Sequence, residues 1–233
     1  MTDLVGKRII VAGGTGDVGA GIVAVLMGMG ADVLVPARDP AKAERLKAES
    51  PPGGRLNILL GEPGTVAGAE ALAAQITDLG KVDAVVASLG GWWQGSSLLG
   101  VQSADWDRII AGNLTSHFAV ARAFLPSLHE HGGSYIQILG GAAQYPIPGS
   151  SLVSITAAAV AMMGRVLAAE NQATSVKVRQ IMIESMVATR ARPDAEAGWV
   201  KVAEIGMAAA RIISAQGGTE NIVRLPSGAG SSL

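Results

Sequence analysis

The chain has 233 residues, of which 49% are hydrophobic and 16% charged, and its formal net charge is −1 at pH 7. This length suits one α/β domain, and the hydrophobic content is ample for its core. The balanced charge argues against nucleic acid as a partner. The absence of cysteine excludes disulfides and thiolate chemistry.

The N-terminal segment, MTDLVGKRIIV, runs directly into an apolar strand pattern, so we expect no signal peptide. The longest stretch of small apolar residues covers 157–164 and is bounded by Thr156 and Arg165. This is well short of the ~18 residues of a membrane helix. We therefore expect a cytoplasmic protein without a membrane partner.

Short apolar runs alternate with segments of helical periodicity along the chain. Strands are expected at residues 8–12, 32–36, 55–60, 82–88, 134–139, 176–183 and 221–225. Helices are expected at residues 17–29, 40–49, 65–78, 104–129, 152–171 and 199–216. Strands that alternate with helices form right-handed βαβ units. The sequence therefore predicts an α/β fold: a single doubly wound Rossmann-type domain over residues 1–226, with a seven-stranded, mostly parallel sheet and helices on both faces. A flexible Gly/Ser-rich tail is expected at 227–233.

A glycine turn joins the first predicted strand to the first predicted helix. Gly13, Gly16 and Gly19 have the spacing G-x-x-G-x-x-G between the strand at 8–12 and the helix at 17–29. Such a turn lets the backbone approach a pyrophosphate, and the helix N-terminus offers free N–H groups to the phosphates. The alternative is a tight strand-to-helix turn without a ligand. The strand before the motif and the helix after it favour dinucleotide binding.

The second predicted strand is followed by the segment PARDP. A carboxylate at this position binds the ribose hydroxyls of NAD, whereas a cation accommodates the 2′-phosphate of NADP. Arg38 is placed for the second task, with an ordinary solvated arginine as the alternative. Asp39 precedes Pro40, the pattern of a helix N-cap followed by proline at the first helical position. We therefore predict NADP(H), with NAD(H) as the alternative cofactor.

Several stretches of the chain together resemble the short-chain dehydrogenase/reductase family over nearly the whole length. The resemblance is carried, in order, by VAGGTGDVG, KVDAVVASLGG, DWDRIIAGNLTSHFAVARAFLPSL, GGSYIQILGGAAQ, SITAAAVAMMGRVLAAE and VKVRQIMIESMVAT. The resemblance implies a Rossmann-type fold and a nicotinamide cofactor. The cofactor-binding residues that it and the glycine motif indicate are Gly13, Thr15, Gly16, Asp17, Val18, Gly19, Arg38, Glu62, Ser88 and Gly90.

The cofactor stretch departs from the family pattern at two places. Asp17 stands where the main branch of the family has glycine, and its carboxylate would repel a pyrophosphate, although it suits the helix dipole. In the G-x-x-G-x-x-G pattern of the extended and atypical branches this position is variable, so binding stays compatible with Asp17. The family motif NNAG reads Ala87-Ser88-Leu89-Gly90 here, without side-chain amides.

The catalytic machinery that the resemblance implies is largely missing. In this family a Tyr exchanges the substrate proton, a Lys four residues later lowers its pKa, a Ser orients the substrate, and an Asn supports a water relay. The Asn falls on Asn113 and is present, but the Ser, Tyr and Lys fall on Gly140, Val153 and Ala157. No lysine lies between Lys81 and Lys177, so no shift of alignment restores the pair.

Tyr145 is the best substitute acid by position, because it follows the predicted strand at 134–139 and so lies near the cleft mouth. Without a nearby lysine, a tyrosine with a pKa near ~10 is a poor base at neutral pH. The alternative is a rim tyrosine without a catalytic role. Asn113 likewise has the alternative of an amide that bonds neighbouring backbone. No group of His, Asp and Glu has metal-ligand spacing, so no metal is expected.

Two further features indicate a ligand and a partner. Trp92 and Trp93 follow the predicted strand at 82–88, and we interpret them as the lining or lid for a small apolar ligand, or as a surface for a partner chain. The predicted helix at 152–171 is apolar on nearly every face and should be buried on every face. In relatives of this family such a helix meets another subunit. We therefore expect a homo-oligomer formed through the helices at 104–129 and 152–171.

Three hypotheses follow. The first is an NADP-dependent oxidoreductase with a substitute acid such as Tyr145. The second, which the missing Ser, Tyr and Lys favour, is a protein that binds cofactor or ligand, or a partner subunit, without carbonyl reduction by the usual mechanism. The third is a different reaction in the emptied pocket, for which the sequence offers no acid–base pair.

Overall fold

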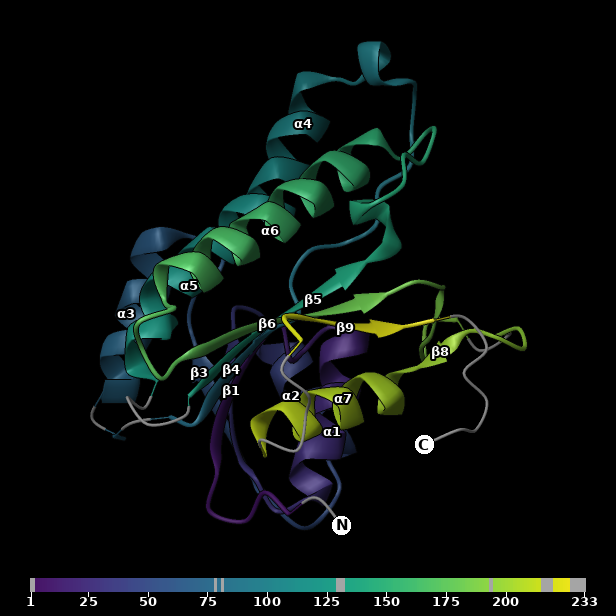
Figure 1. Cartoon of the computed structure of the whole chain (residues 1–233). Coiled ribbons are helices and arrows are strands. Elements are labelled where there is room, and N and C mark those ends of the chain that lie inside the picture. The colour runs from purple at the N-terminus through teal and green to yellow at the C-terminus, as the bar shows by residue number, and fades with distance from the viewer. Residues whose placement is uncertain are drawn as a thin grey trace.

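Seven parallel strands form one sheet in the order β3-β2-β1-β4-β5-β6-β9 (Figure 1). The computed structural model describes residues 3–77, 79–80, 82–128, 133–192, 195–214 and 220–226. The strands are β1 Arg8–Ala12, β2 Asp32–Ala37, β3 Arg55–Leu60, β4 Ala84–Ala87, β5 Ser134–Gly140, β6 Lys177–Ile183 and β9 Ile222–Leu225. The predicted doubly wound fold is confirmed. The predicted tail at 227–233 lies outside the described residues.

The helices are α1 Asp17–Gly28, α2 Pro40–Glu49, α3 Val66–Thr77, α4 Ser103–Ile110, α5 Ser116–Phe124, α6 Ser151–Glu170 and α7 Val202–Ile213. Asp39 caps α2 as predicted, since its side chain accepts hydrogen bonds from the N–H groups of Ala41 and Lys42 at 2.9 and 3.2 Å. The single helix predicted over 104–129 is interrupted. A π-helical turn, η2 (Ala111–Thr115), separates α4 from α5, and a short 3₁₀ turn, η3 (Leu125–Ser127), follows α5.

A second, two-stranded sheet was not predicted. Its strands, β7 (Val187–Ala188) and β8 (Val200–Lys201), pair in parallel between β6 and α7. The N–H of Val200 donates to the Met186 carbonyl at 3.0 Å and to Ser185 Oγ at 3.1 Å. Two residues per strand are too short for a periodic sequence signal. This small sheet holds both ends of the segment that joins β6 to α7.

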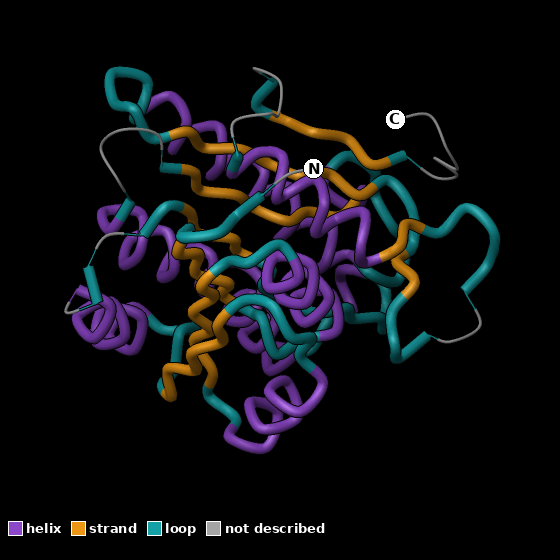
Figure 2. The backbone as a smooth tube through the Cα atoms, turned by 90° about the horizontal axis from the view of Figure 1, so that it is seen from below, coloured by secondary structure: helices purple, strands orange, loops and turns teal. Residues whose placement is uncertain are grey.

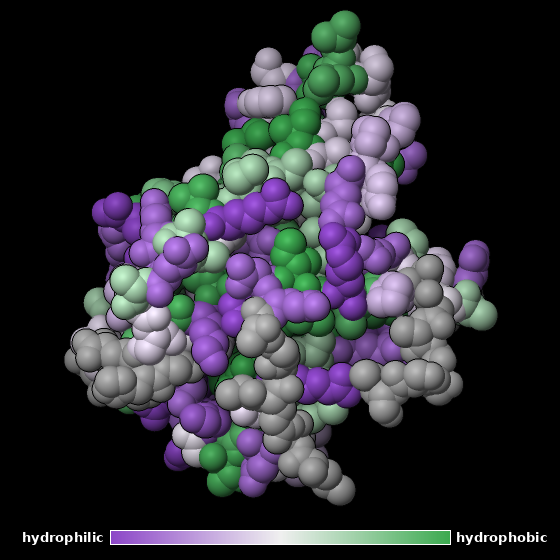
Figure 3. All heavy atoms as spheres, in the orientation of Figure 1, coloured by the Kyte–Doolittle hydropathy of each residue, from purple (hydrophilic) through white to green (hydrophobic). Residues whose placement is uncertain are grey.

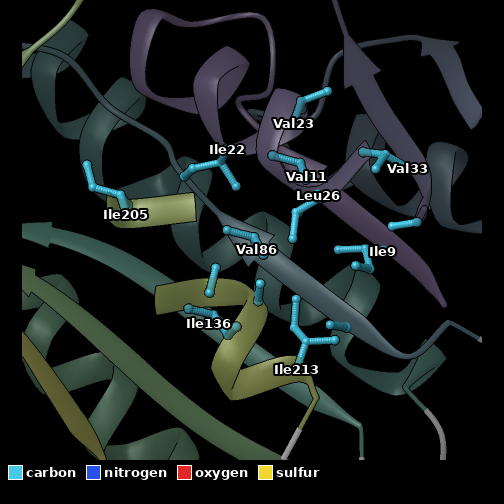
Figure 4. Close-up of a cluster of buried hydrophobic side chains, with 14 of the residues drawn as sticks. Ile9, Val11, Ile22, Val23, Leu26, Val33, Val86, Ile136, Ile205 and Ile213 are labelled. Carbon is cyan, nitrogen blue, oxygen red and sulfur yellow. The ribbon is translucent and has the colours of Figure 1, made fainter. Parts of the chain in front are cut away.

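Alternate side chains of the strands face two separate hydrophobic layers, as expected for strands covered on both faces. Ile9 and Val11 of β1 pack with Ile22 of α1 and Ile205 of α7 (Figure 4). Ile10 lies on the other face, in the layer formed with α3 and α5. Figure 2 shows the strands enclosed between these helices. Because the seven strands are parallel, their carboxyl ends all lie at one edge of the sheet, where α1 begins.

The long helix α6 differs from the sequence prediction. Its buried residues form one stripe, namely Leu152, Thr156, Val160, Ala161 and Gly164. Met162 and Val166 on another face are 54% and 46% exposed, so the helix is not buried on every side within one chain. By length and composition alone, α6 meets the criteria for a membrane span, with a mean hydropathy of 1.8. The shorter run expected at 157–164 underestimated this apolar stretch.

A pair of buried glutamines fastens α6 to the sheet. Gln180 of β6 donates through Nε2 to Gln137 Oε1 of β5 at 2.9 Å and to the Ala161 carbonyl of α6 at 3.0 Å. Both glutamine side chains are buried. The helix comes so near at Gly164 that a Cβ there would overlap both amide groups. Glycine at this position therefore sets the distance between α6 and the sheet.

Candidate functional site

A cavity of about 640 Å³ lies at the carboxyl ends of the strands. Its walls come from the first turn of α1, the loop after β4, the end of β5 with the 3₁₀ turn η4 (Gly141–Ala143), the start of α6, and the segment from β6 to β8. In a doubly wound sheet, ligands bind at this edge of the strands. The cavity therefore unites the predicted cofactor turn with the predicted catalytic wall.

The glycine turn has the geometry that close approach to a phosphate requires. Gly13 has a φ of +82°, and a Cβ there would overlap the Ser88 carbonyl oxygen. A Cβ at Gly19 would overlap the Gly13 carbonyl oxygen. Gly16 occupies the N-cap of α1 without a side-chain cap, so the first N–H groups of the helix remain available for an anion. Gly16, Asp17, Val18 and Gly19 line the cavity, whereas Gly13 and Thr15 do not.

Asp17 does not stand alone at the phosphate turn. Arg190, from the segment between β7 and β8, lies with its Nη2 3.4 Å from Asp17 Oδ1. The same guanidinium forms an ion pair with Glu49 at the end of α2. No sequence pattern predicts this cluster, because Arg190 and Asp17 are 173 positions apart. The carboxylate that would repel a pyrophosphate is therefore partly neutralised.

Arg38 and Glu62, predicted as separate contacts for the cofactor, lie together. Arg38 Nη1 is 3.6 Å from Glu62 Oε2, and the two side chains are 74% and 42% exposed. They follow β2 and β3, which are adjacent in the sheet. Glu62 also accepts a hydrogen bond from the Gly64 N–H at 2.9 Å. The pair lies outside the cavity lining, at the position where an adenosine would extend along the sheet edge.

The loop after β4 is fastened by Asn113 of the π-helical turn. Asn113 Oδ1 accepts from the Gly91 N–H, and Asn113 Nδ2 donates to the Gly91 carbonyl, both at 2.9 Å. The neighbouring Gly90 has a φ of +97°. Ser88 and Gly90 line the cavity, but Asn113 does not. The Asn113 side chain is thus engaged in holding the loop.

Gly140, Val153 and Ala157 all line the cavity. Gly140 ends β5, and the other two lie one turn apart at the start of α6. These are the positions at which the resemblance places Ser, Tyr and Lys. The wall here offers a bare backbone and two aliphatic side chains to a substrate, and none of these groups can transfer a proton.

The two tyrosines have different surroundings. Tyr145 lines the cavity and is 65% exposed, and its hydroxyl makes no hydrogen bond to any residue that the structure describes. Tyr135 lies inside the sheet and is fully buried, which raises the pKa of its phenol above the usual range. The Tyr135 hydroxyl has no partner among the described residues. Of the two, only Tyr145 is accessible to a ligand.

Two charged residues of the cavity were not predicted as site residues. Glu184, directly after β6, forms an ion pair with Arg224 of β9, which also donates to Gln144 Oε1 at 3.2 Å. Arg192 lines the cavity from the segment between β7 and β8. The register pairs Gly140 with Ile183, so Glu184 follows directly beside the position of the missing serine. The signal available in the sequence was its place directly after the strand predicted at 176–183, at the carboxyl end of the sheet.

The tryptophan pair is divided between the cavity and the core. Trp92 lines the cavity and is 50% exposed. Trp93 is only 7% exposed and packs with Ile109 of α4 and Leu152 of α6. The interpretation of both as cavity lining or lid is therefore wrong for Trp93. Consecutive side chains in an extended loop point to opposite sides, which places the Trp92 ring at the cavity and the Trp93 ring in the core.

His117 of α5 is buried within the chain. Its side chain is 2% exposed, and burial lowers its pKa to about 4, against a smaller opposing effect of a hydrogen bond with the Leu89 backbone. The imidazole is therefore neutral at pH 7. Through the hydrogen bond with the Leu89 backbone it holds the loop after β4, and it brings no charge to the site.

The residues present fit a nicotinamide dinucleotide at the phosphate turn. The positive φ at Gly13, the close approach at Gly19 and the uncapped N-terminus of α1 form a cradle that any Cβ at these glycines would fill. Among the described residues, no group of three or more His, Cys, Asp or Glu side chains could hold a metal ion.

The family model for short chain dehydrogenases matches residues 7–197. The chain belongs to this family. Over 211 residues it is 24% identical to a 3-oxoacyl-(acyl-carrier-protein) reductase of Chlamydia pneumoniae, covering 88% of this chain and 85% of that protein. It spans about half the length of two other curated relatives, both named "Probable oxidoreductase", from Streptomyces lividans and Streptomyces antibioticus.

Solved structures of the family share the fold. A short-chain dehydrogenase/reductase from Mycobacterium ulcerans superposes with a TM-score of 0.84 at 20% identity, covering 96% of this chain and 89% of that one. A dehydrogenase from Agrobacterium tumefaciens with bound NADP gives a TM-score of 0.80 at 20% identity, covering 97% and 96%. Nicotinamide cofactors are therefore bound within this family, and the present chain is an oxidoreductase-family protein.

Proposed function

We propose that this protein binds NADP(H) in the cleft and does not reduce carbonyls by the usual mechanism of its family. One observation carries the proposal: the three positions where the resemblance places Ser, Tyr and Lys all line the same cavity, and they are occupied by Gly140, Val153 and Ala157. Reduction of a carbonyl requires a proton donor near its oxygen. When bound, the nicotinamide supplies hydride chemistry, and this chain supplies binding, orientation and an apolar wall.

The preference for NADP(H) over NAD(H) rests on Arg38. Its guanidinium is 74% exposed and lies at the end of β2, where a ribose 2′-phosphate is read. The pair with Glu62 is exposed and therefore weak, so a phosphate with two negative charges competes for the guanidinium. Glu62 remains beside the adenosine as an acceptor. NAD(H), which lacks the 2′-phosphate, gains nothing from Arg38.

The first test is a titration with NADPH and NADH, followed by quenching of tryptophan fluorescence and by calorimetry. Trp92 lines the cavity, so its emission responds to a ligand there. We expect NADPH to bind at least about tenfold more tightly than NADH, and Arg38→Ala to abolish that preference. The matched control is Arg45→Ala on α2. Equal binding of both cofactors, or binding of neither, would contradict the proposal.

The alternative function is an oxidoreductase in which Tyr145 replaces the missing acid. Its place in the cavity lining favours it. The cavity lining among the described residues contains no lysine to assist a tyrosine, which opposes it. A carbonyl panel with NADPH decides between the two. Turnover at ordinary enzyme rates that falls in Tyr145→Phe would establish the alternative, and absence of turnover supports a binding or partner subunit.

We further propose a cytoplasmic homo-oligomer with a small apolar ligand beside Trp92. Several large apolar side chains are exposed on the outer faces of α4, α5 and α6, namely Trp106, Phe118, Ile155, Met162 and Val166. A surface of this kind favours a second copy of the chain. Figure 3 also shows hydrophobic residues at the outer tip of the molecule, above α4. Leu98 and Leu99, in the segment before α4, are also exposed. Light scattering with Met162→Glu tests the oligomer.

A further inference from the structure

We infer that Arg190 is a ligand of the cofactor diphosphate, which draws its guanidinium away from Asp17 and Glu49. This inference rests on the proposed binding of NADP(H). It assigns a binding role to a residue of the segment between β7 and β8, far in sequence from the glycine turn. The two carboxylates then hold the arginine ready beside the phosphate position when no dinucleotide is bound.

The position of Arg190 is the first argument. Its Nη2 lies 3.4 Å from Asp17 Oδ1, and Asp17 is the first residue of α1 and lines the cavity. The uncapped N–H groups of this helix turn are the anion site of the fold. A guanidinium that already contacts the first residue of the helix is within reach of an anion bound to the same turn.

The charges are the second argument. One arginine is shared between Asp17 and Glu49, so this cluster carries a net negative charge where a diphosphate must bind. The three side chains are between 39% and 48% exposed, and exposed ion pairs of this kind contribute little. Phosphate oxygens offer Arg190 a bidentate, more strongly charged partner. Exchange of carboxylates for phosphates is therefore favourable.

The backbone around Arg190 is the third argument. The N–H of Arg192 donates to the Thr189 carbonyl at 2.9 Å, which closes a turn that contains Arg190. Thr189, Ala191 and Arg192 line the cavity, so the residues on either side of Arg190 form its wall. A diphosphate that engages Arg190 consequently fixes the position of this part of the wall. Cofactor binding then sets the space left in the cavity for the proposed apolar ligand.

The experiment compares two probes by calorimetry. ADP-ribose carries the diphosphate, whereas adenosine 2′-monophosphate carries only the phosphate that Arg38 reads. We expect Arg190→Ala to weaken ADP-ribose binding about tenfold and to leave adenosine 2′-monophosphate unchanged. Asp17→Asn and Glu49→Gln should tighten ADP-ribose binding severalfold. Arg55→Ala is the matched control, since Arg55 is an exposed arginine paired with Asp32 at the other end of the sheet.

The double variant Asp17→Asn/Arg190→Ala separates direct contact from neutralisation. If Arg190 contacts the diphosphate, its removal still weakens ADP-ribose binding about tenfold in the Asp17→Asn background. If its removal then has no effect, Arg190 only neutralises Asp17 and the inference is wrong. Unchanged ADP-ribose binding by Arg190→Ala alone overturns it as well. Failure of the wild type and of Asp17→Asn to bind NADPH, NADH or ADP-ribose would instead overturn the proposed function, and this inference with it.

Discussion

The two walls of the cleft differ in how much of the family pattern they keep. The wall formed by the α1 turn keeps the backbone geometry of a dinucleotide site, including a positive φ at Gly13 and close contact at Gly19. The wall formed by β5 and α6 keeps its shape but presents Gly140, Val153 and Ala157. Backbone geometry at the first wall is tied to folding, because the turn joins β1 to α1. Side chains at the second wall face a cavity and are free to change without loss of the fold.

The largest effect is expected from restoring the catalytic wall. The triple variant Gly140→Ser, Val153→Tyr, Ala157→Lys should gain NADPH-dependent reduction of members of a carbonyl panel by about 10²–10⁴-fold over the wild type, the usual contribution of general acid catalysis. A Cβ at Gly140 meets nothing within 4 Å, so the serine fits. Steady-state oxidation of NADPH measures the gain.

The control replaces Val153 with Phe in the same triple background, which keeps the ring and omits the hydroxyl. It should remain as inactive as the wild type. A triple variant that binds NADPH and still shows no turnover would mean that the two walls are no longer aligned for hydride transfer.

The glycine turn offers the converse test. Gly13→Ala should lower the free energy of unfolding by about 3 kcal/mol, because the residue has a positive φ and its Cβ would overlap the Ser88 carbonyl. Gly28→Ala is the matched control: its Cβ meets nothing within 4 Å, so it should stabilise α1 by about 0.5–1 kcal/mol. Urea unfolding measures both. A tolerated Gly13→Ala would show that the turn is not under the constraint described.

The free energy of unfolding should depend on pH through His117, the buried histidine that contacts the loop after β4. Folding lowers the pKa of His117 from 6.5 to about 4, so the unfolded chain binds more protons between these values. The free energy of unfolding therefore falls as the pH decreases below 6.5, and the loss is complete below about pH 4. His117 alone accounts for about 2 kcal/mol between pH 7 and pH 5.

Urea unfolding at pH 7 and pH 5 for the wild type and His117→Gln checks this. The difference between the two pH values should shrink by about 2 kcal/mol in the variant, whatever its stability at pH 7. An unchanged difference would mean that the buried imidazole titrates normally.

The smallest effect concerns the strand of the catalytic wall. Tyr135→Phe removes a buried hydroxyl without a partner among the described residues and should change stability by about 0 to +1 kcal/mol. Thermal unfolding measures this, with Tyr145→Phe as the exposed counterpart. A marked loss of stability in Tyr135→Phe would contradict this and indicate that the hydroxyl is hydrogen-bonded.

The cofactor wall was largely predictable from sequence, and the catalytic wall was predictable mainly by what it lacks. The glycine spacing and the cap at Asp39 are local features, so short-range pattern identifies them. The pairing of Arg190 with Asp17 joins residues 173 positions apart, and the contact of Asn113 with Gly91 depends on a π-helical turn. The separate fates of Trp92 and Trp93 depend on which side of a loop faces α6. Tertiary packing decides all three.

The glutamine pair behind α6 has a consequence for how such a site changes over time. Gly164 and Ala157 are seven positions apart, two helical turns along one side of α6. The amides of Gln137 and Gln180 lie directly against Gly164 and fix the distance between the second half of α6 and the sheet. Because this half is fixed, the first turns of α6, which line the cavity, keep their distance from the sheet whichever side chains they carry. The scaffold therefore separates the placement of this helix from the side chains it carries, so we expect substitutions at Val153 and Ala157 to change the chemistry of the cavity without moving α6.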